Sequence, residues 1–250
     1  MKYSFQGQSV LVTGAASGIG EATARLLAAN GLSVVVSDVQ AKAVDRVVAA
    51  IVADGGKAVA NVADVSRAEQ VEAAVDCAVR QFGALHFAVN NAGIGGDLGP
   101  VGDITLDNWQ RVIDINLSGV AYGLRYQIPA ILAAGGGAIV NMSSILGLVG
   151  EAIAPAYNAA KHGVTGLTRS AALAYSAQGV RINSIHPGYV DTAILSGFDD
   201  AARAGLVSQH PIGRLGRSEE IAHAIAFLLS DGASFMTGSA LIADGGYTAR

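Results

Sequence analysis

Short runs of apolar, often β-branched residues alternate along this chain with longer segments of helical periodicity. The strand-like runs are SVLVT (9–13), SVVVS (33–37), AVANV (58–62), HFAVN (86–90), AIVNM (138–142), VRINSI (180–185) and ALIAD (240–244), of which AVANV is the weakest. Most are apolar at nearly every position, which is typical of strands covered on both faces. Strands and helices that alternate in this order indicate a parallel α/β sheet with right-handed crossovers.

The predicted helices lie between these runs, over 21–30, 43–56, 68–83, 106–134, 157–179 and 218–232. No linker, low-complexity tract or repeat separates them. We therefore expect a single domain over 1–250, with a Rossmann-type doubly wound sheet and helices on both faces. The stretch from about 187 to 216 has no clear period and is long for an ordinary connection, so we expect a functional loop there.

Composition restricts the possible partners. Hydrophobic residues make up 51% of the 250 residues and charged residues only 14%, so we expect apolar surface to meet other subunits. No apolar run reaches the roughly 18 residues of a membrane span. A net charge of −4 with scattered Lys and Arg argues against a nucleic-acid partner. Cys77 is the only cysteine and the N-terminus has no signal-peptide pattern, so we expect a cytoplasmic protein.

The first strand-like run leads into a glycine-rich turn, TGAASGIG, with Gly14, Gly18 and Gly20. Glycine permits a sharp turn and a close approach to a phosphate, and the N-terminus of the next helix favours an anion. Asp38 ends the second run, where a carboxylate can accept hydrogen bonds from an adenosine ribose. These features together favour a dinucleotide over a turn without a ligand. Asp64 has two interpretations at this stage, a contact to adenine or a helix N-cap.

Tyr157 and Lys161, in YNAAK, are four residues apart and share one face of a helix. A free tyrosine has a pKa of about 10, and a nearby ammonium group lowers the pKa of the phenol. Tyr157 is therefore a candidate general acid/base. Ser143 and Ser144, in NMSS, follow the fifth run and could hold a substrate oxygen at the carboxyl edge of the sheet.

Six motifs occur along the chain in the order and spacing that are typical of one protein family. They are TGAASGIG, NNAG (90–93), INL around Asn116, NMSS (141–144), YNAAK (157–161) and PGYVDT (187–192). Through these motifs the chain resembles the short-chain dehydrogenase/reductase family, and the resemblance extends from SVLVTG near the N-terminus to DGGYTAR at the C-terminus. Within the family it is most similar to bacterial NAD-dependent secondary-alcohol dehydrogenases and carbonyl reductases. The resemblance implies an oxidoreductase that transfers a hydride between NAD(H) and a secondary alcohol/ketone substrate, with Tyr157 as general acid/base.

The family spacing favours Ser144 over Ser143, and it implies that Asn116 holds a water that connects Lys161 to solvent. The implied catalytic set is Asn116, Ser144, Tyr157 and Lys161. The implied NAD-binding set is Gly14, Ser17, Gly18, Ile19, Gly20, Asp38, Asp64, Val65, Asn91, Ala92, Gly93, Tyr157, Lys161, Pro187, Gly188, Val190 and Thr192. A small, mainly apolar alcohol or ketone is expected to meet Ser144, Ile145, Leu146, Glu151, Ile153, Tyr189, Ile194, Leu195, Phe198 and Leu206.

NAD is expected rather than NADP, because the Asp38 carboxylate would repel a 2′-phosphate. Ser17 and Val39 occupy the positions where NADP enzymes of this family usually carry a cation. The five histidines lack metal-site spacing, so we expect no metal. The resemblance also implies a homotetramer that pairs the helix over 106–133 with the helix from Tyr157, where Ala159, Ala160, Gly163 and Gly166 would permit close approach.

Three other functions fit parts of the sequence. A 3-oxoacyl thioester reductase or a hydroxysteroid dehydrogenase of the same family would carry the same motifs. A non-catalytic dinucleotide-binding regulatory protein would keep the glycine turn but would not need Tyr157 or Lys161.

Overall fold

The computed structural model describes residues 2–195 and 197–249, without the side chain of residue 194. Within these residues one sheet contains seven parallel strands in the order β3-β2-β1-β4-β5-β6-β7. All seven predicted strands are present, with ends that differ by no more than two residues from those predicted. They are β1 (Ser9–Thr13), β2 (Ser33–Asp38), β3 (Lys57–Val62), β4 (Phe87–Asn90), β5 (Gly137–Met142), β6 (Val180–Pro187) and β7 (Ala240–Ala243).

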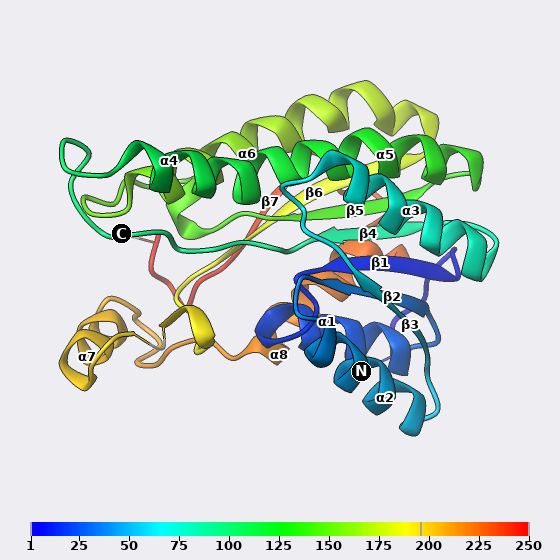
Figure 1. Ribbon diagram of the computed structural model, residues 1–250, viewed down its shortest axis with the longest axis horizontal. Helices are drawn as coiled ribbons and strands as arrows, with labels where there is room; N and C mark the ends of the chain where they lie inside the picture. The colour runs from blue at the N-terminus through cyan, green and yellow to red at the C-terminus, as the bar shows by residue number, and fades with distance from the viewer. Residues whose placement is uncertain (1, 196, 250) are drawn as a thin grey trace.

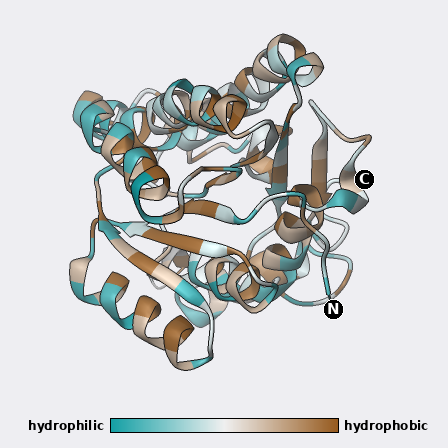
Figure 2. Cartoon of the chain, turned by 90° about the vertical axis from the view of Figure 1, so that its right-hand side faces the viewer, coloured by the Kyte–Doolittle hydropathy of each residue, from teal (hydrophilic) through white to brown (hydrophobic). Residues whose placement is uncertain are grey.

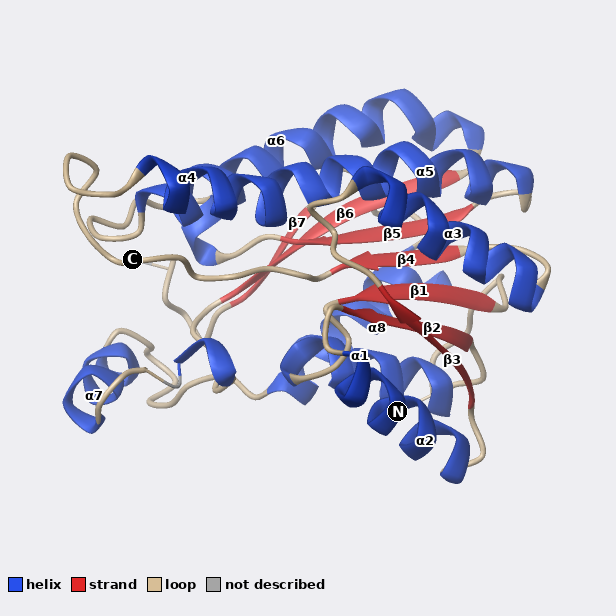
Figure 3. Ribbon diagram, viewed as in Figure 1, coloured by secondary structure: helices blue, strands red, loops and turns tan. Residues whose placement is uncertain are grey.

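Helices cover both faces of the sheet, which confirms the predicted fold class (Figures 1 and 3). One face carries α3 (Ala68–Phe82), α4 (Leu106–Ile113), α5 (Gly119–Ala133) and α6 (Pro155–Tyr175). The other carries α1 (Gly18–Ala29), α2 (Ala41–Ala53) and α8 (Ser218–Leu229).

Strand side chains point alternately to the two faces, so the sheet separates two apolar clusters. Val10 and Val12 pack with residues of α1, α2 and α8, whereas Leu11 packs with residues of α3, α5 and α6. All three side chains are fully buried. Figure 2 shows the same pattern, with strands that are largely hydrophobic and helices that alternate between hydrophobic and hydrophilic residues. This double burial explains the continuous apolar runs of the sequence.

The strand order reverses between β1 and β4, which are neighbours in the sheet. At such a point the connections on the two sides run in opposite directions, and a crevice opens at the carboxyl ends of the strands. The glycine-rich turn follows β1 and the loop from Asn91 follows β4. Both therefore border this crevice.

Two elements differ from the prediction. The single helix expected over 106–134 is interrupted by a π-helical turn, Asp114–Ser118, between α4 and α5. The stretch 187–216, expected to be irregular, contains α7 (Asp200–Ser208), whose N-terminus is capped by Asp199. Figure 1 shows α7 standing away from the sheet, beyond the ends of its strands. No helix in the described part of the chain is long and apolar enough to cross a membrane.

Candidate active site

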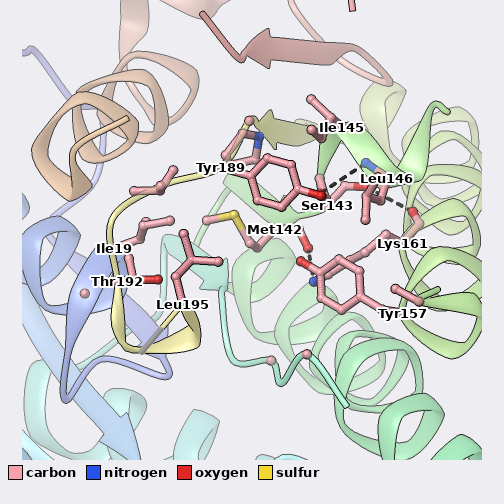
Figure 4. Close-up of a pocket in the computed structure, with 18 of the residues that line it drawn as sticks. Ile19, Met142, Ser143, Ile145, Leu146, Tyr157, Lys161, Tyr189, Thr192 and Leu195 are labelled. Atoms are coloured by element: carbon pink, nitrogen blue, oxygen red, sulfur yellow. Dashed lines mark hydrogen bonds between the residues drawn. The ribbon is translucent and has the colours of Figure 1, made fainter. Parts of the chain in front are cut away.

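A cavity of about 530 Å³ lies at the carboxyl ends of β1, β4, β5 and β6 (Figure 4). Its walls come from segments that directly follow these strands: Gly14 after β1, Asn91 after β4, Ser144 after β5 and Gly188 after β6. The position agrees with the general rule that ligands of doubly wound sheets bind at the strand-order reversal.

The glycine-rich turn forms one end of this cavity. Gly14 and Gly18 have φ values of 62° and 51°, which side chains rarely adopt. A Cβ atom at Gly14 would also lie 2.8 Å from the Cα of Ala92. The turn delivers the chain into the N-terminus of α1, whose first N–H groups have no partner within the helix and attract anions. The residues present therefore fit a phosphate-bearing cofactor.

Asn91 ties this turn to the neighbouring strand. Its side-chain amide donates to the carbonyl oxygens of Thr13 and Gly14, both at 3.0 Å. Its main-chain N–H donates to Oγ1 of Thr13 at 3.1 Å. The ends of β1 and β4 are thus joined directly. The other predicted cofactor residues that line the cavity are Ser17, Ile19, Gly20, Ala92, Gly93, Pro187, Val190 and Thr192.

Asp38 is the last residue of β2 and lies beside the glycine-rich turn. One carboxylate oxygen accepts from the N–H of Ala16 at 3.2 Å, and the other accepts from the N–H of Gln40 at 3.1 Å. Asp38 lies outside the cavity lining within the described residues. Its position at the strand tip is nevertheless the one expected from the sequence.

Arg46 was missed in the sequence because it lies in α2, distant along the chain from the glycine-rich turn. Its guanidinium donates to the carbonyl oxygen of Ala16 at 2.9 Å and to both carboxylate oxygens of Glu21, at 2.8 and 2.6 Å. Ala16 therefore contacts Asp38 through its N–H and Arg46 through its carbonyl group. The guanidinium of Arg46 therefore lies near Asp38, and the Glu21 carboxylate compensates the positive charge of Arg46.

Asp64 and Val65 follow β3 and also lie outside the cavity lining in the described chain. The Asp64 carboxylate accepts from the N–H of Ser66 at 2.9 Å and from its hydroxyl at 2.8 Å. The N-cap of α3 is Arg67, so the N-cap alternative for Asp64 is wrong; the carboxylate stabilises the preceding turn. Val65 packs toward Gly119, where a Cβ atom would meet its side chain at 3.0 Å.

Ser144, Tyr157 and Lys161 all line the cavity, and Figure 4 shows Tyr157 and Lys161 side by side on one wall. Ser144 lies two residues beyond β5 and is the N-cap of a short 3₁₀ turn, where its Oγ accepts from the N–H of Leu146 at 3.1 Å. Its side chain also hydrogen-bonds to that of Tyr157. Lys161 is buried, and its Nζ lies 5.3 Å from the centroid of the Tyr157 ring.

The pKa of Tyr157 differs from the expectation. Burial raises it above the ordinary value, and the hydrogen bond with Ser144 opposes this effect. The lowering by Lys161 that the sequence led us to expect does not outweigh this burial, which also lowers the pKa of Lys161 itself to about 8.

The adjacent Ser143 is engaged elsewhere. Its hydroxyl lies 3.0 Å from the carbonyl oxygen of Lys161 and 3.1 Å from the hydroxyl of Thr165, both on α6. Ser143 thus attaches the end of β5 to α6. Ser144 retains the hydroxyl that meets Tyr157.

Asn116 lies in the π-helical turn and is fully buried. Its side chain accepts from the N–H of Ile94 and donates to the carbonyl oxygen of the same residue, both at 2.8 Å. The amide therefore secures the loop after β4, and Asn116 lies outside the cavity lining among the described residues. A Cβ atom at Gly93 would lie 3.2 Å from Oδ1 of Asn116 and 3.6 Å from Nζ of Lys161, so the two side chains flank Gly93. π-turns of this kind frequently mark functional sites.

The cavity is also lined by most of the predicted substrate residues, which are mainly apolar. They are Ser144, Ile145, Leu146, Glu151, Ile153, Tyr189, Leu195, Phe198 and Leu206. The prediction for Ile194 lies outside the described side chains. Sequence reasoning did not include Gly95, Gly96, Leu98, Met142, Ala154, Ala193 and Gln209, which also line it.

The loop after β6 is attached to α7. The N–H of Tyr189 donates to Nε2 of His210 at 3.1 Å, and Nδ1 of His210 lies 2.8 Å from the carbonyl oxygen of Leu206. Arg203 on α7 pairs with Asp191. Burial and the nearby Glu151 carboxylate raise the pKa of Tyr189, so its phenol is neutral near pH 7. The 187–216 stretch therefore forms the outer wall of the cavity.

Comparison with known proteins agrees with this geometry. A family model described as "Enoyl-(Acyl carrier protein) reductase" matches residues 14–248. The chain is 54% identical to a cyclohexanol dehydrogenase of Acinetobacter sp. over 250 residues, which cover 100% of this chain and 98% of that protein. It is 49% identical to a cis-4-hydroxycyclohexanecarboxylate dehydrogenase of Sinomonas cyclohexanicum, with 100% of both chains covered.

A solved structure shows the same fold. The crystal structure of levodione reductase superposes with a TM-score of 0.94 at 38% identity, covering 98% of this chain and 99% of that one. The family model, the relatives that match over the full length and the superposed structure all indicate the same family. The chain therefore belongs to the short-chain dehydrogenase/reductase family of oxidoreductases, and its cofactor is a nicotinamide dinucleotide.

Proposed function

We propose that this protein interconverts an alicyclic secondary alcohol and the corresponding ketone, with NAD as the hydride carrier. The observation that carries the proposal is that Ser144, Tyr157 and Lys161 all line one largely apolar cavity. The same cavity is also lined by the glycine-rich turn at the N-terminus of α1. Cofactor and substrate can thus meet in one enclosure.

The side chains divide the chemistry between them. A bound nicotinamide supplies the acceptor for the hydride that leaves the alcohol carbon. Tyr157, as phenolate, takes the hydroxyl proton of the alcohol, and in the reverse direction its phenol returns that proton to the ketone oxygen. Ser144 holds the same oxygen through its hydroxyl, which does not titrate in the accessible pH range.

Lys161 and Asn116 support this proton transfer. Lys161 is held beside the ring of Tyr157 and, in its protonated form, favours the phenolate. Its pKa of about 8 allows it to exchange a proton near neutral pH. Asn116 and Lys161 both lie beside Gly93, which supports the proposal that a water near Asn116 connects Lys161 to solvent.

The preference for NAD over NADP rests on Asp38 and on the Glu21–Arg46 pair. The Asp38 carboxylate lies beside the glycine-rich turn, where it would accept hydrogen bonds from a free ribose hydroxyl and would repel a phosphate. Arg46 could in principle attract the phosphate. Because both of its terminal nitrogens bond to Glu21, the pair is close to neutral.

The lining of the cavity and the names of two relatives support the substrate class. The cavity volume of about 530 Å³ is shared between the predicted cofactor residues and the predicted substrate residues. The mainly apolar lining beside Tyr157 suits the ring of an alicyclic alcohol. Two relatives are named for cyclohexanol and for a hydroxycyclohexanecarboxylate, which supports a ring alcohol here.

The experiment is a set of steady-state assays by NADH absorbance. Cyclohexanol, a linear secondary alcohol with six carbons, a hydroxysteroid and a 3-hydroxyacyl thioester are each tested with NAD. The proposal predicts the highest kcat/KM for cyclohexanol. A higher kcat/KM for the steroid or the thioester would refute the substrate class while leaving the hydride chemistry intact.

Assembly and location are also proposals. Leu106 and Leu173 are 83% and 89% exposed on α4 and α6, the helices expected to pair in a homotetramer. Gly166 has open space at its Cβ position, whereas Gly163 packs against Leu117 of the same chain and Ala160 is buried. Only part of the surface formed by these small residues is thus free for a partner subunit.

The single, half-buried Cys77 supports a reducing, cytoplasmic environment.

A further inference from the structure

His186 connects strand β6 to the segment that carries Ser144. It is the second-last residue of β6 and is fully buried. Its Nδ1 lies 2.8 Å from the carbonyl oxygen of Ser144, and its Nε2 lies 2.8 Å from Oγ of Ser184. Both ring nitrogens are therefore in hydrogen bonds, and one of these leads directly to the main chain of the candidate catalytic serine.

The direction of these hydrogen bonds follows from their chemistry. A carbonyl oxygen only accepts, so Nδ1 carries the proton and donates to Ser144. Burial lowers the pKa of His186, which favours the neutral ring. Nε2 is then unprotonated and can accept from the hydroxyl of Ser184, so the carbonyl group of Ser144 sets the tautomer.

Ser144 depends on such support because it lies beyond the sheet. The β5–β6 ladder ends at Met142 paired with Ile185, and one more bond joins the N–H of Ser143 to the carbonyl oxygen of Ile185 at 2.9 Å. The Ser144 carbonyl also accepts from the N–H of Gly147 at 2.9 Å, which closes the 3₁₀ turn. Only the bond from His186 joins that carbonyl group to β6 among the described contacts.

We propose that His186 is a positioning residue, whose Nδ1–H fixes the main chain of Ser144 and thereby aims its hydroxyl at the substrate oxygen. This rests on the proposed function, in which Ser144 holds that oxygen. Misplacement of a contact by about 1 Å can cost about 100-fold in rate, even when the altered residue does not touch the substrate. His186 would therefore affect kcat without contacting substrate or cofactor.

The test compares His186→Asn with His186→Gln. The Asn amide nitrogen can occupy the place of Nδ1 and donate to Ser144, whereas the longer Gln side chain places its amide nearer the place of Nε2. We expect kcat for cyclohexanol to fall about 10- to 100-fold in His186→Gln and in His186→Leu, and to stay within about fivefold of wild type in His186→Asn. The Kd for NADH, measured by fluorescence, should change little in all three.

A destabilised control separates positioning from general loss of stability. Ile182→Ala removes a buried side chain of the same strand, in the cluster on the α5–α6 side of the sheet. It should lower the Tm while leaving kcat near the wild-type value. Equal kcat values for the Asn and Gln variants, or a fall in kcat that follows Tm across all four proteins, would overturn the proposal.

Ser144→Ala distinguishes this inference from the proposed function. If Ser144→Ala retains wild-type turnover, then Ser144 is not the contact to the substrate oxygen and the proposed mechanism is wrong. If Ser144→Ala is inactive while His186→Gln behaves as wild type, only the role of His186 is refuted.

Discussion

Nζ of Lys161 lies 2.8 Å from the carbonyl oxygen of Met142, the last residue of β5, and is buried there. A main-chain carbonyl group compensates an ammonium charge only in part, so burial lowers the pKa of Lys161 to about 8. The contact holds the lysine beside Tyr157. It also means that a charged Lys161 destabilises the folded protein.

Stability should therefore depend on pH through Lys161. The pKa is about 8 in the folded chain and 10.5 for the free group, so the unfolded state binds more protons between these values. The contribution of Lys161 to the free energy of unfolding should rise by about 2 kcal/mol between pH 7 and 9.5. Urea unfolding at both pH values gives the change in the free energy of unfolding for wild type and for Lys161→Met, and the difference between the two changes is the contribution of Lys161. Equal changes in the two proteins would contradict this prediction.

Cofactor preference should follow Asp38. The unmodified protein should have a much higher kcat/KM with NADH than with NADPH, because the carboxylate repels the 2′-phosphate. Asp38→Ala combined with Val39→Arg should lower the ratio of kcat/KM with NADH to kcat/KM with NADPH, or bring it below one, since the repulsion is removed and a cation is added. A ratio at or below one in the unmodified protein would show that Asp38 does not determine the choice.

The Glu21–Arg46 pair should also affect this preference. Glu21→Gln leaves the guanidinium of Arg46 uncompensated beside the glycine-rich turn, so NADPH should bind more tightly relative to NADH. The ratio of the two Kd values, measured by fluorescence, reports the change without turnover. Asp54→Asn is the matched control, because Asp54 pairs with Arg25 at 3.1 Å on the surface. Equal effects of the two substitutions would exclude a specific role for the pair.

The oligomer should be a tetramer of the 25.2 kDa chain. Light scattering at micromolar concentration should give about four times this mass, because Leu106 and Leu173 leave apolar surface exposed on two long helical elements. Leu173→Glu should lower the mass, since a charge placed in an apolar interface is costly. A mass near that of one chain for the wild type would refute this assembly.

The strands could be predicted because they are buried on both faces, so that each appears as an apolar run, such as SVVVS before Asp38. The helix over 106–134 was predicted as continuous because its composition gives no sign of the π-turn. Asn116, in that turn, makes a double hydrogen bond to Ile94, a tertiary contact that the sequence does not reveal. The helix α7 was missed because its short, Ala- and Gly-rich sequence has no strong apolar period.

Contacts between distant segments could not be read from the sequence. Arg46 reaches the glycine-rich turn from α2, and His186 reaches Ser144 from the neighbouring strand. A buried network of side chains, missed for the same reason, joins the ends of β4 and β5 to two helices through Asn90, Gln127, Asn141 and Thr168. The glycines of IGGDLG (94–99), directly after NNAG, were the one available signal for the missed cavity residues Gly95 and Gly96.

Replacement of the Tyr157 hydroxyl tests the central claim most directly. Tyr157→Phe keeps the ring, which packs in the cluster with Val112 and Ala160, and removes the group that exchanges the proton, so kcat for cyclohexanol with NAD should fall by roughly 10²- to 10⁴-fold. The Kd for NADH should stay close to the wild-type value, which shows that the cavity is intact. Turnover within tenfold of wild type would mean that Tyr157 is not the general acid/base and would contradict the mechanism.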